Sequence, residues 1–183
     1  MEFFKRGSCE EFEKVLQLYP KALEAKAQQK MKKKGESLKS LDRWMQEELK
    51  TTADSREPPH INRAELVRLV EWKLTRGKFR PRLIELAGSN EEGEVVRVTG
   101  EGLRLGEEGR VMEAIQMMAS LRGIGPATAS AILAVCQPNN FSFFADEVAQ
   151  TVLPTAALPQ VHSEGIRGCE CCCGGLRCEA KQG

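Results

Sequence analysis

The sequence has few aromatic residues, almost no excess charge and too few dispersed cysteines for a disulfide framework. Aromatic side chains make up only 5% of the 183 residues, and β-branched runs are scarce, which argues against an all-β sandwich. The 27 basic and 26 acidic residues leave a net charge of +1, so the chain as a whole is not strongly polyanion-binding, although a local basic patch stays open. A hydrophobic fraction of 41% suits a globular domain of ordinary size.

Most of the seven cysteines lie in one short stretch, and only Cys9 and Cys136 lie elsewhere. Two dispersed cysteines give no disulfide framework and predict a reducing compartment. The clustered cysteines are Cys169, Cys171, Cys172, Cys173 and Cys178. Adjacent cysteines cannot easily all ligate one ion, and the spacing fits neither a paired Cys-x-x-Cys zinc site nor a four-cysteine iron–sulfur loop. We therefore expect no metal site and no cofactor.

Charge is also missing from one stretch of 23 residues, between Arg122 and Asp146. By length alone this stretch could span a bilayer. It contains Pro126 and Pro138 among polar neighbours, so we interpret it as a buried helix followed by a turn and expect no membrane partner. The opening pair Phe3–Phe4 is too short for the apolar core of a secretory signal. These features predict a soluble protein, cytosolic or nuclear.

Helix start signals and an apolar period of about 3.6 residues predict an all-α fold. Ser8 with Glu11 and Asn62 with Glu65 have the pattern of capping boxes, and Ser40 is predicted to cap a further helix. Other helices are expected from Pro81 and over residues 89–105, 111–121 and 127–135.

Composition divides the chain into a helical domain over residues 1–152 and a poorly structured, Cys-rich tail over 153–183. Within the domain, residues 51–60 contain two prolines and several small polar residues, which predicts an internal linker. The sequence shows no alternation of period two and no repeat of fixed length, so strands and solenoids are not expected.

The sharpest functional signal is the glycine hairpin Leu121–Ala129 between two predicted helices. Gly123 and Gly125 are expected to permit the positive φ angles of a tight turn and to leave nearby amides uncovered. Ile124 would pack the turn onto its helices, and Pro126 suits the first turn of the second helix. Amides at a helix N-terminus bind anions, so the hairpin could hold a DNA phosphate without reading the base. A plain connection between helices is the alternative interpretation.

The hairpin and the segment after it resemble the helix-hairpin-helix of the HhH-GPD DNA glycosylase superfamily, and especially the Amun-type glycosylase-like proteins. The resemblance is strongest over residues 109–150, with an acid at Asp146 after a loop, and stops after about Val152. It implies a helical DNA-glycosylase-like fold, C-terminally incomplete in this chain, with double-stranded DNA as partner, base excision in DNA repair and a location in the nucleus. The implied DNA-backbone contacts are Arg122, Gly123, Ile124, Gly125 and Thr128.

Asp146 stands where the family has its catalytic acid, which implies activation of water for monofunctional N-glycosidic hydrolysis of an extruded base. Asp146 would also serve as a helix cap, and the two roles are compatible. Bifunctional members have a lysine two residues after the second hairpin glycine, where this chain has Ala127, so the resemblance implies no lyase activity. Glu147 also departs from the usual small polar residue. The alternative to an enzyme is an inactive glycosylase-like module that binds DNA or protein in nuclear regulation.

A basic strip over residues 72–82 contains no acid. Its cations are interleaved with Trp72 and Phe79, a pattern that suits a DNA backbone. A solvated surface is the alternative. The predicted DNA contacts of the strip are Lys73, Arg76, Lys78 and Arg80.

Overall fold

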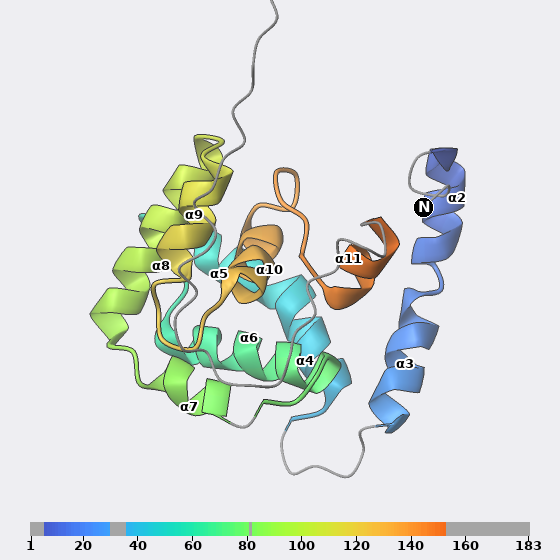
Figure 1. Ribbon diagram of the computed structural model, residues 1–183, viewed down its shortest axis with the longest axis horizontal. Coiled ribbons are helices and arrows are strands. Elements are labelled where there is room, and N and C mark those ends of the chain that lie inside the picture. The colour runs from blue at the N-terminus through green and yellow to red at the C-terminus, as the bar shows by residue number, and fades with distance from the viewer. Residues whose placement is uncertain (1–5, 30–35, 81, 153–183) are drawn as a thin grey trace, which may run out of the picture.

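The structure is a computed structural model that describes residues 6–29, 36–80 and 82–152. These residues form helices, turns and loops without a strand, which confirms the all-α prediction (Figure 1). The elements are α2 (Cys9–Leu16), α3 (Tyr19–Gln29), α4 (Leu38–Trp44), the π-helical η1 (Met45–Leu49), α5 (Lys50–Asp54), α6 (Arg63–Arg76), α7 (Arg82–Gly88), α8 (Glu92–Glu107), α9 (Val111–Met118), α10 (Pro126–Cys136) and α11 (Asp146–Val152). The predicted tail, 153–183, lies outside the described residues.

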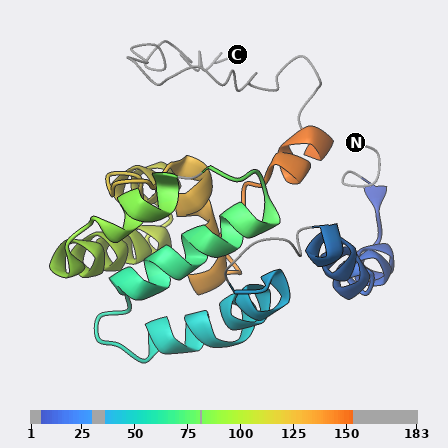
Figure 2. The same cartoon turned by 90° about the horizontal axis from the view of Figure 1, so that it is seen from below.

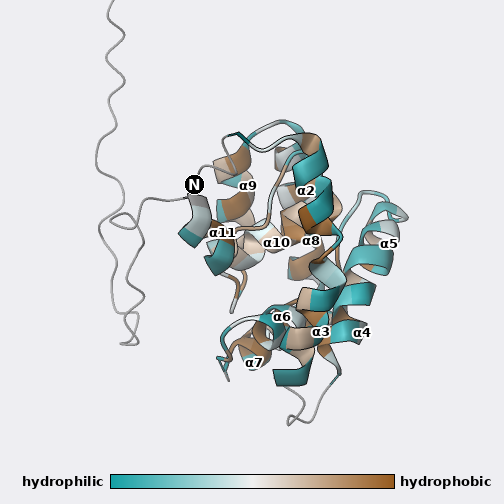
Figure 3. Ribbon diagram, turned by 90° about the vertical axis from the view of Figure 1, so that its right-hand side faces the viewer, coloured by the Kyte–Doolittle hydropathy of each residue, from teal (hydrophilic) through white to brown (hydrophobic). Residues whose placement is uncertain are grey.

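Helix α10 forms the centre of the bundle and contacts α5, η1, α6, α8 and α9 (Figure 1). Its residues are apolar on nearly every side, and Ala129, Ile132 and Leu133 are fully buried. Apolar colour also gathers on α9 beside it, whereas α4 and α5 carry much of the polar colour (Figure 3). A helix that is apolar all round belongs inside a core, so the uncharged stretch is a buried helix and turn, as predicted. None of the helices in the described ranges is long and apolar enough to cross a membrane.

Two predicted capping boxes are confirmed. The Glu11 amide donates to Ser8 Oγ at 3.3 Å, and the Ser8 amide donates to the Glu11 carboxylate at 2.8 Å. The Asn62 side chain accepts from the Glu65 amide at 2.9 Å, and the Glu65 carboxylate accepts from the Asn62 amide at 2.8 Å. Each reciprocal pair satisfies two amides that have no partner inside the helix, which fixes the starts of α2 and α6.

Two predicted boundaries differ from the structure. Helix α4 begins at Leu38, and its N-cap is Ser37, whose hydroxyl accepts from the Ser40 amide at 3.2 Å. The prediction of Ser40 as the cap is wrong, because Leu38 is itself buried in the core and extends the helix toward the N-terminus. The predicted linker also begins too early, since residues 51–54 belong to α5 and the side chain of Ala53 is buried.

Helices α2 and α3 lie at one edge of the bundle in both views (Figures 1 and 2). The Tyr19 hydroxyl, at the start of α3, donates to the carboxylate of Asp42 in α4 at 2.8 Å. Asp42 is buried and also accepts from Trp72 Nε1 at 2.9 Å and from Gln46 Nε2 at 2.7 Å. A buried carboxylate with three donors joins α3, α4, η1 and α6, and it places the indole of Trp72 near the end of α6.

Candidate nucleic-acid interface

The hairpin between α9 and α10 has a tight turn, but only one of its glycines needs to be glycine. Gly123 has a φ of 78°, and a Cβ there would lie 2.9 Å from the Ala87 amide nitrogen. Gly125 has a φ of −103° and a ψ of 174°, extended backbone that any residue adopts. The prediction of a positive φ at Gly125 is therefore wrong. Nothing lies within 4 Å of the place where a Gly125 Cβ would be, so this glycine leaves the start of α10 open.

The first turn of α10 presents backbone amides at this opening. Ile124 is buried at 5% exposure and Pro126 begins the helix, both as predicted. The amides of Thr128 and Ala129 donate to the Gly125 carbonyl at 2.8 and 2.9 Å. The amides of Gly125 and Ala127 have no acceptor within the described part of the chain. Two open N–H groups at a helix N-terminus are suited to bind an anion.

Asn90 holds the hairpin in place, a role that sequence reasoning missed. Its Oδ1 accepts from the Arg122 amide at 2.9 Å, and its Nδ2 donates to the Arg122 carbonyl at 3.0 Å and to the Ala87 carbonyl at 2.9 Å. The side chain is 2% exposed and ties the hairpin to the end of α7. The sequence shows Asn90 only as one member of a polar run after Gly88, which does not indicate what its side chain would contact.

Helix α6 brings Lys73 to the start of α10. Lys73 Nζ donates to Thr128 Oγ1 at 2.8 Å, and the Thr128 side chain is buried. Burial lowers the pKa of Lys73, Arg80 lowers it further, and the Asp146 carboxylate acts in the opposite direction. Predicted residues from three parts of the sequence, the basic strip, the hairpin and the acid after it, therefore share one neighbourhood. We call Lys73, Arg80, Gly125, Thr128 and Asp146 the hairpin face.

Arg76 is engaged differently from the other predicted cations. Its guanidinium carbon lies 5.3 Å from the ring centroid of Phe143 and 5.7 Å from that of Trp72, so it stacks against two aromatic rings. Its Nη1 is 3.9 Å from Glu147 Oε2, and the other oxygen of that carboxylate, Oε1, accepts from Lys26 Nζ at 3.0 Å. The Glu147 carboxylate thus offsets the charge of Arg76 and joins α3 to α11.

The remaining predicted cations are Lys78, Arg80 and Arg122, and all three side chains are exposed. None of them forms an ion pair with another residue of the described ranges. Phe79, between two of these cations, is 53% exposed. Exposed cations interleaved with an aromatic ring suit a phosphate backbone with a base or sugar beside it.

Asp146 is exposed and is the first residue of α11. The cap position is thus Ala145, whose carbonyl accepts from the Ala149 amide at 3.0 Å. The predicted cap hydrogen bond of the Asp146 side chain has no counterpart within the described residues. A carboxylate without a capping duty is free to act on Lys73 and on whatever approaches the hairpin face. Phe144, two residues before Asp146 in the sequence, is 48% exposed.

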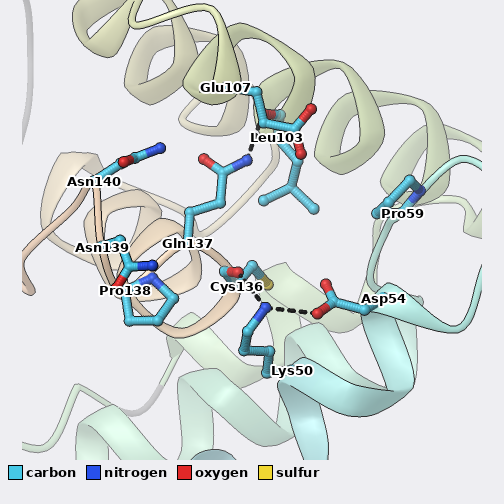
Figure 4. A pocket seen from close by; sticks show the side chains of 10 residues that line it. All are labelled: Lys50, Asp54, Pro59, Leu103, Glu107, Cys136, Gln137, Pro138, Asn139 and Asn140. Atoms are coloured by element: carbon cyan, nitrogen blue, oxygen red, sulfur yellow. Dashed lines mark hydrogen bonds and ion pairs between the residues drawn. The ribbon is translucent and has the colours of Figure 1, made fainter.

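A hollow of about 430 Å³ lies at the opposite end of α10 (Figure 4). Lys50 Nζ donates there to the Asp54 carboxylate and to the Cys136 carbonyl, and Asp146 does not line the space. Burial raises the pKa of Cys136 to about 12, so its thiol stays neutral and unreactive. The lining residues are Lys50, Asp54, Pro59, Leu103, Glu107, Cys136, Gln137, Pro138, Asn139 and Asn140. The hollow is therefore separate from the hairpin face.

No three His, Cys, Asp or Glu side chains gather as a metal site within the described residues, and the cysteine cluster lies outside them. Comparisons with protein-family models, curated proteins and solved structures found no match to this chain. The resemblance to DNA glycosylases thus rests on the hairpin motif and the residues after it.

Proposed function

We propose that this chain binds double-stranded DNA without base preference through the hairpin face. The observation that carries the proposal is that cations from α6 and from the loop after α6 lie close to the open N-terminus of α10. Lys73 lies 2.8 Å from Thr128 in the first turn of α10, and Arg80 is close enough to lower the pKa of Lys73. A phosphate at the Gly125 and Ala127 amides would meet a helix dipole and positive side chains together.

Contacts of this kind position a duplex but do not read its sequence. Backbone amides and lysine or arginine side chains bind phosphates equally beside any base pair. The proposed contacts are therefore Arg122, Gly123 and Gly125 in the hairpin with Lys73, Lys78 and Arg80. The buried Ile124 and Thr128 support these contacts by holding the turn and the Lys73 amine in place. Arg76 serves as a stacked, partly neutralised neighbour. A DNA partner also accounts for the proposed location in the nucleus.

Substitution of Gly125 by valine tests the hairpin directly. Because Gly125 is extended and open, valine adds a side chain over the amides without straining the turn. We expect DNA affinity to fall by about tenfold, equally for unrelated sequences, through loss of one to two phosphate hydrogen bonds. Gly93→Val in α8 is the matched control, since the space around its Cβ position is also open. Unchanged affinity of Gly125→Val at the same salt concentration would remove the hairpin from the proposal.

A second candidate function is monofunctional hydrolysis of an N-glycosidic bond in DNA repair. The observation that favours it is the exposed Asp146 carboxylate, which lies near Lys73 and has no capping duty. A carboxylate there could activate water or stabilise the cationic sugar as the bond breaks. The alternative is an inactive glycosylase-like module that binds DNA or protein and in which Asp146 takes no part in catalysis.

Single-turnover excision assays separate these two functions. Asp146→Asn removes the negative charge but keeps the size of the side chain. If the carboxylate is catalytic, this variant should lose excision, and DNA binding is measured in parallel. The assay needs duplexes that carry a range of lesions, because the target base is unspecified. Excision at the wild-type rate in Asp146→Asn would end the case for this acid. An absence of excision in the wild-type protein would favour the binding module.

A further inference from the structure

The hollow at the end of α10 opposite the hairpin is a pocket that the proposed DNA binding does not use. Its volume of about 430 Å³ falls within the range of about 300–1,000 Å³ that is usual for small-molecule sites. Helices α5 and α8, the turn after α10 and the loop that contains Pro59 each supply part of its wall (Figure 4). These segments are distant in the sequence and meet only in the fold. The hollow therefore has the size and the composite walls of a ligand site.

Hydrogen bonds between the segments hold the walls of the hollow in place. Gln137 Nε2 donates to the Leu103 carbonyl at 2.8 Å, which joins the turn after α10 to α8. The Gln137 carbonyl accepts from the Asn140 amide at 3.0 Å, which closes that turn. Lys50 Nζ donates to the Cys136 carbonyl at 3.1 Å and so joins α5 to the end of α10. A ligand would therefore enter a preformed site, which lowers the entropy cost of binding.

The charged groups around the hollow leave an excess of negative charge. Lys50 is already engaged, because its Nζ donates to the Asp54 carboxylate at 2.5 Å as well as to the end of α10. Glu107 is exposed and forms no ion pair with another residue of the described ranges. One lysine and two acids leave a net charge of −1 in the lining. The C-terminus of α10 adds the negative end of a helix dipole, so the hollow favours a cation over an anion.

The uncharged part of the lining suits a cation that carries a carbon chain. Pro59, Leu103 and Pro138 are apolar and can contact methylene groups. Asn139 and Asn140 are exposed, and their amide oxygens can accept from N–H donors. An ammonium or guanidinium group supplies several such donors, whereas a bare metal ion would leave the apolar wall without a contact.

We propose that the hollow binds a small organic cation, an ammonium or guanidinium group on a short carbon chain, with Glu107 as its ion-pair partner. The chain lies against the apolar wall, and the charged end meets the carboxylate. The inference stands apart from the proposed DNA binding, because the hollow lies at the other end of α10 from the hairpin face. The probe is agmatine, in which methylene groups join a guanidinium group to an ammonium group.

An NMR titration of the full chain with agmatine, without DNA, tests where the cation binds. Saturable shifts are expected at the backbone amides of Glu107, Asn139 and Asn140, and no shift at Ile124 in the hairpin. Guanidinium ion lacks the chain and should bind more weakly, and pentanol lacks the charge and should give no saturable shift. Agmatine shifts confined to other parts of the surface would overturn the proposal. Equal affinity for guanidinium ion would do so too, because it would show attraction to surface charge alone.

Substitution of Glu107 gives a second measurement. Glu107→Gln keeps the size of the side chain but removes its charge, so the Kd for agmatine should rise about tenfold through loss of a charged hydrogen bond. Glu94→Gln is the matched control, since it removes an exposed acid of the same helix that does not line the hollow. The control should bind agmatine as the wild type does. An unchanged Kd in Glu107→Gln, or an equal rise in both variants, contradicts the inference.

Discussion

At the scale of single residues, the two hairpin glycines have different physical duties. Gly123 is held at a φ of 78° with Ala87, Leu83 and Leu86 atoms within 3.0 Å of a built Cβ. Gly125 has neither constraint. The sequence pattern alone could not separate them, because both are glycines in the same turn. The separation appears only when the packing of α7 under the hairpin is known.

Gly123→Ala should destabilise the fold. The new Cβ would add left-handed backbone strain and contacts with α7 backbone, for a loss of about 1–3 kcal/mol in the free energy of unfolding. Chemical denaturation measures this loss. Gly93→Ala, a helix position with open space, should be neutral or slightly stabilising because alanine favours a helix. Equal stability of the two variants would show that the turn tolerates a side chain at Gly123.

The raised pKa of Cys136 predicts both its reactivity and a pH dependence. Because the pKa of its thiol in the fold is about 12, Cys136 is neutral at pH 8. Alkylation at that pH should therefore modify the exposed Cys9 and spare Cys136. The unfolded thiol ionises near its ordinary pKa of about 8.5, so the free energy of unfolding should fall as pH rises above that value. Peptide mapping and denaturation between about pH 8 and 11 check both expectations. Rapid labelling of Cys136 in the folded protein would contradict them.

Some residue contacts are beyond sequence reasoning altogether. Lys73 and Thr128 are 55 residues apart, and each was predicted as a DNA contact on separate grounds. Their hydrogen bond depends on how α6 crosses the start of α10, which no local pattern encodes. Arg76 shows the converse, because a predicted phosphate contact is stacked on Trp72 and Phe143 and paired with Glu147.

At the scale of elements, helix starts were predictable where side chain and backbone form reciprocal bonds. Ser8 and Asn62 each have a glutamate three residues later, and both capping boxes are present. The four glycines of α8 lower its helix propensity, yet two of them, Gly102 and Gly106, are needed for its packing. A Cβ at Gly102 would lie 2.8 Å from the Met118 side chain, and one at Gly106 would lie 3.0 Å from the Phe141 ring. Close approach of neighbouring elements therefore outweighs the low helix propensity of glycine.

Helix α2 should exchange its amide hydrogens much faster than α6. No residue of α2 is buried, whereas α6 buries Leu66, Leu69 and three other side chains. A helix of eight residues without tertiary burial opens at little free-energy cost. Hydrogen exchange read by mass spectrometry measures the difference. Protection of α2 equal to that of α6 would contradict this prediction.

The attachment of α3 provides the matched comparison. Tyr19→Phe removes one donor to Asp42 and should raise exchange in α3 while leaving α6 protected, because Trp72 and Gln46 still donate to the carboxylate.

At the scale of the whole molecule, the amino-acid composition gives no indication of the proposed DNA binding. A net charge of +1 gives no sign of a polyanion partner. Folding changes the picture locally, because the loop after α6 exposes Lys78 and Arg80 while acids such as Glu147 pair with Lys26 and Arg76. DNA binding by such a protein would depend on a small patch and not on overall attraction. Salt dependence is therefore the measurement that reports the size of the patch.

Affinity for DNA should fall steeply with salt, by an amount set by the number of phosphate contacts. Each contact contributes about 0.9 to the slope of log affinity against log salt on duplex DNA. Lys78→Met and Arg80→Met should each lower that slope by about one and weaken binding equally for unrelated sequences. Fluorescence anisotropy with two duplexes between about 50 and 200 mM salt measures these slopes. Lys39→Met removes the same charge from α4, outside the hairpin face, and should leave the slope unchanged. If binding occurs at the proposed contacts, the position of the lost charge matters and the three variants should differ. An equal loss of slope in all three would show instead that binding follows net charge.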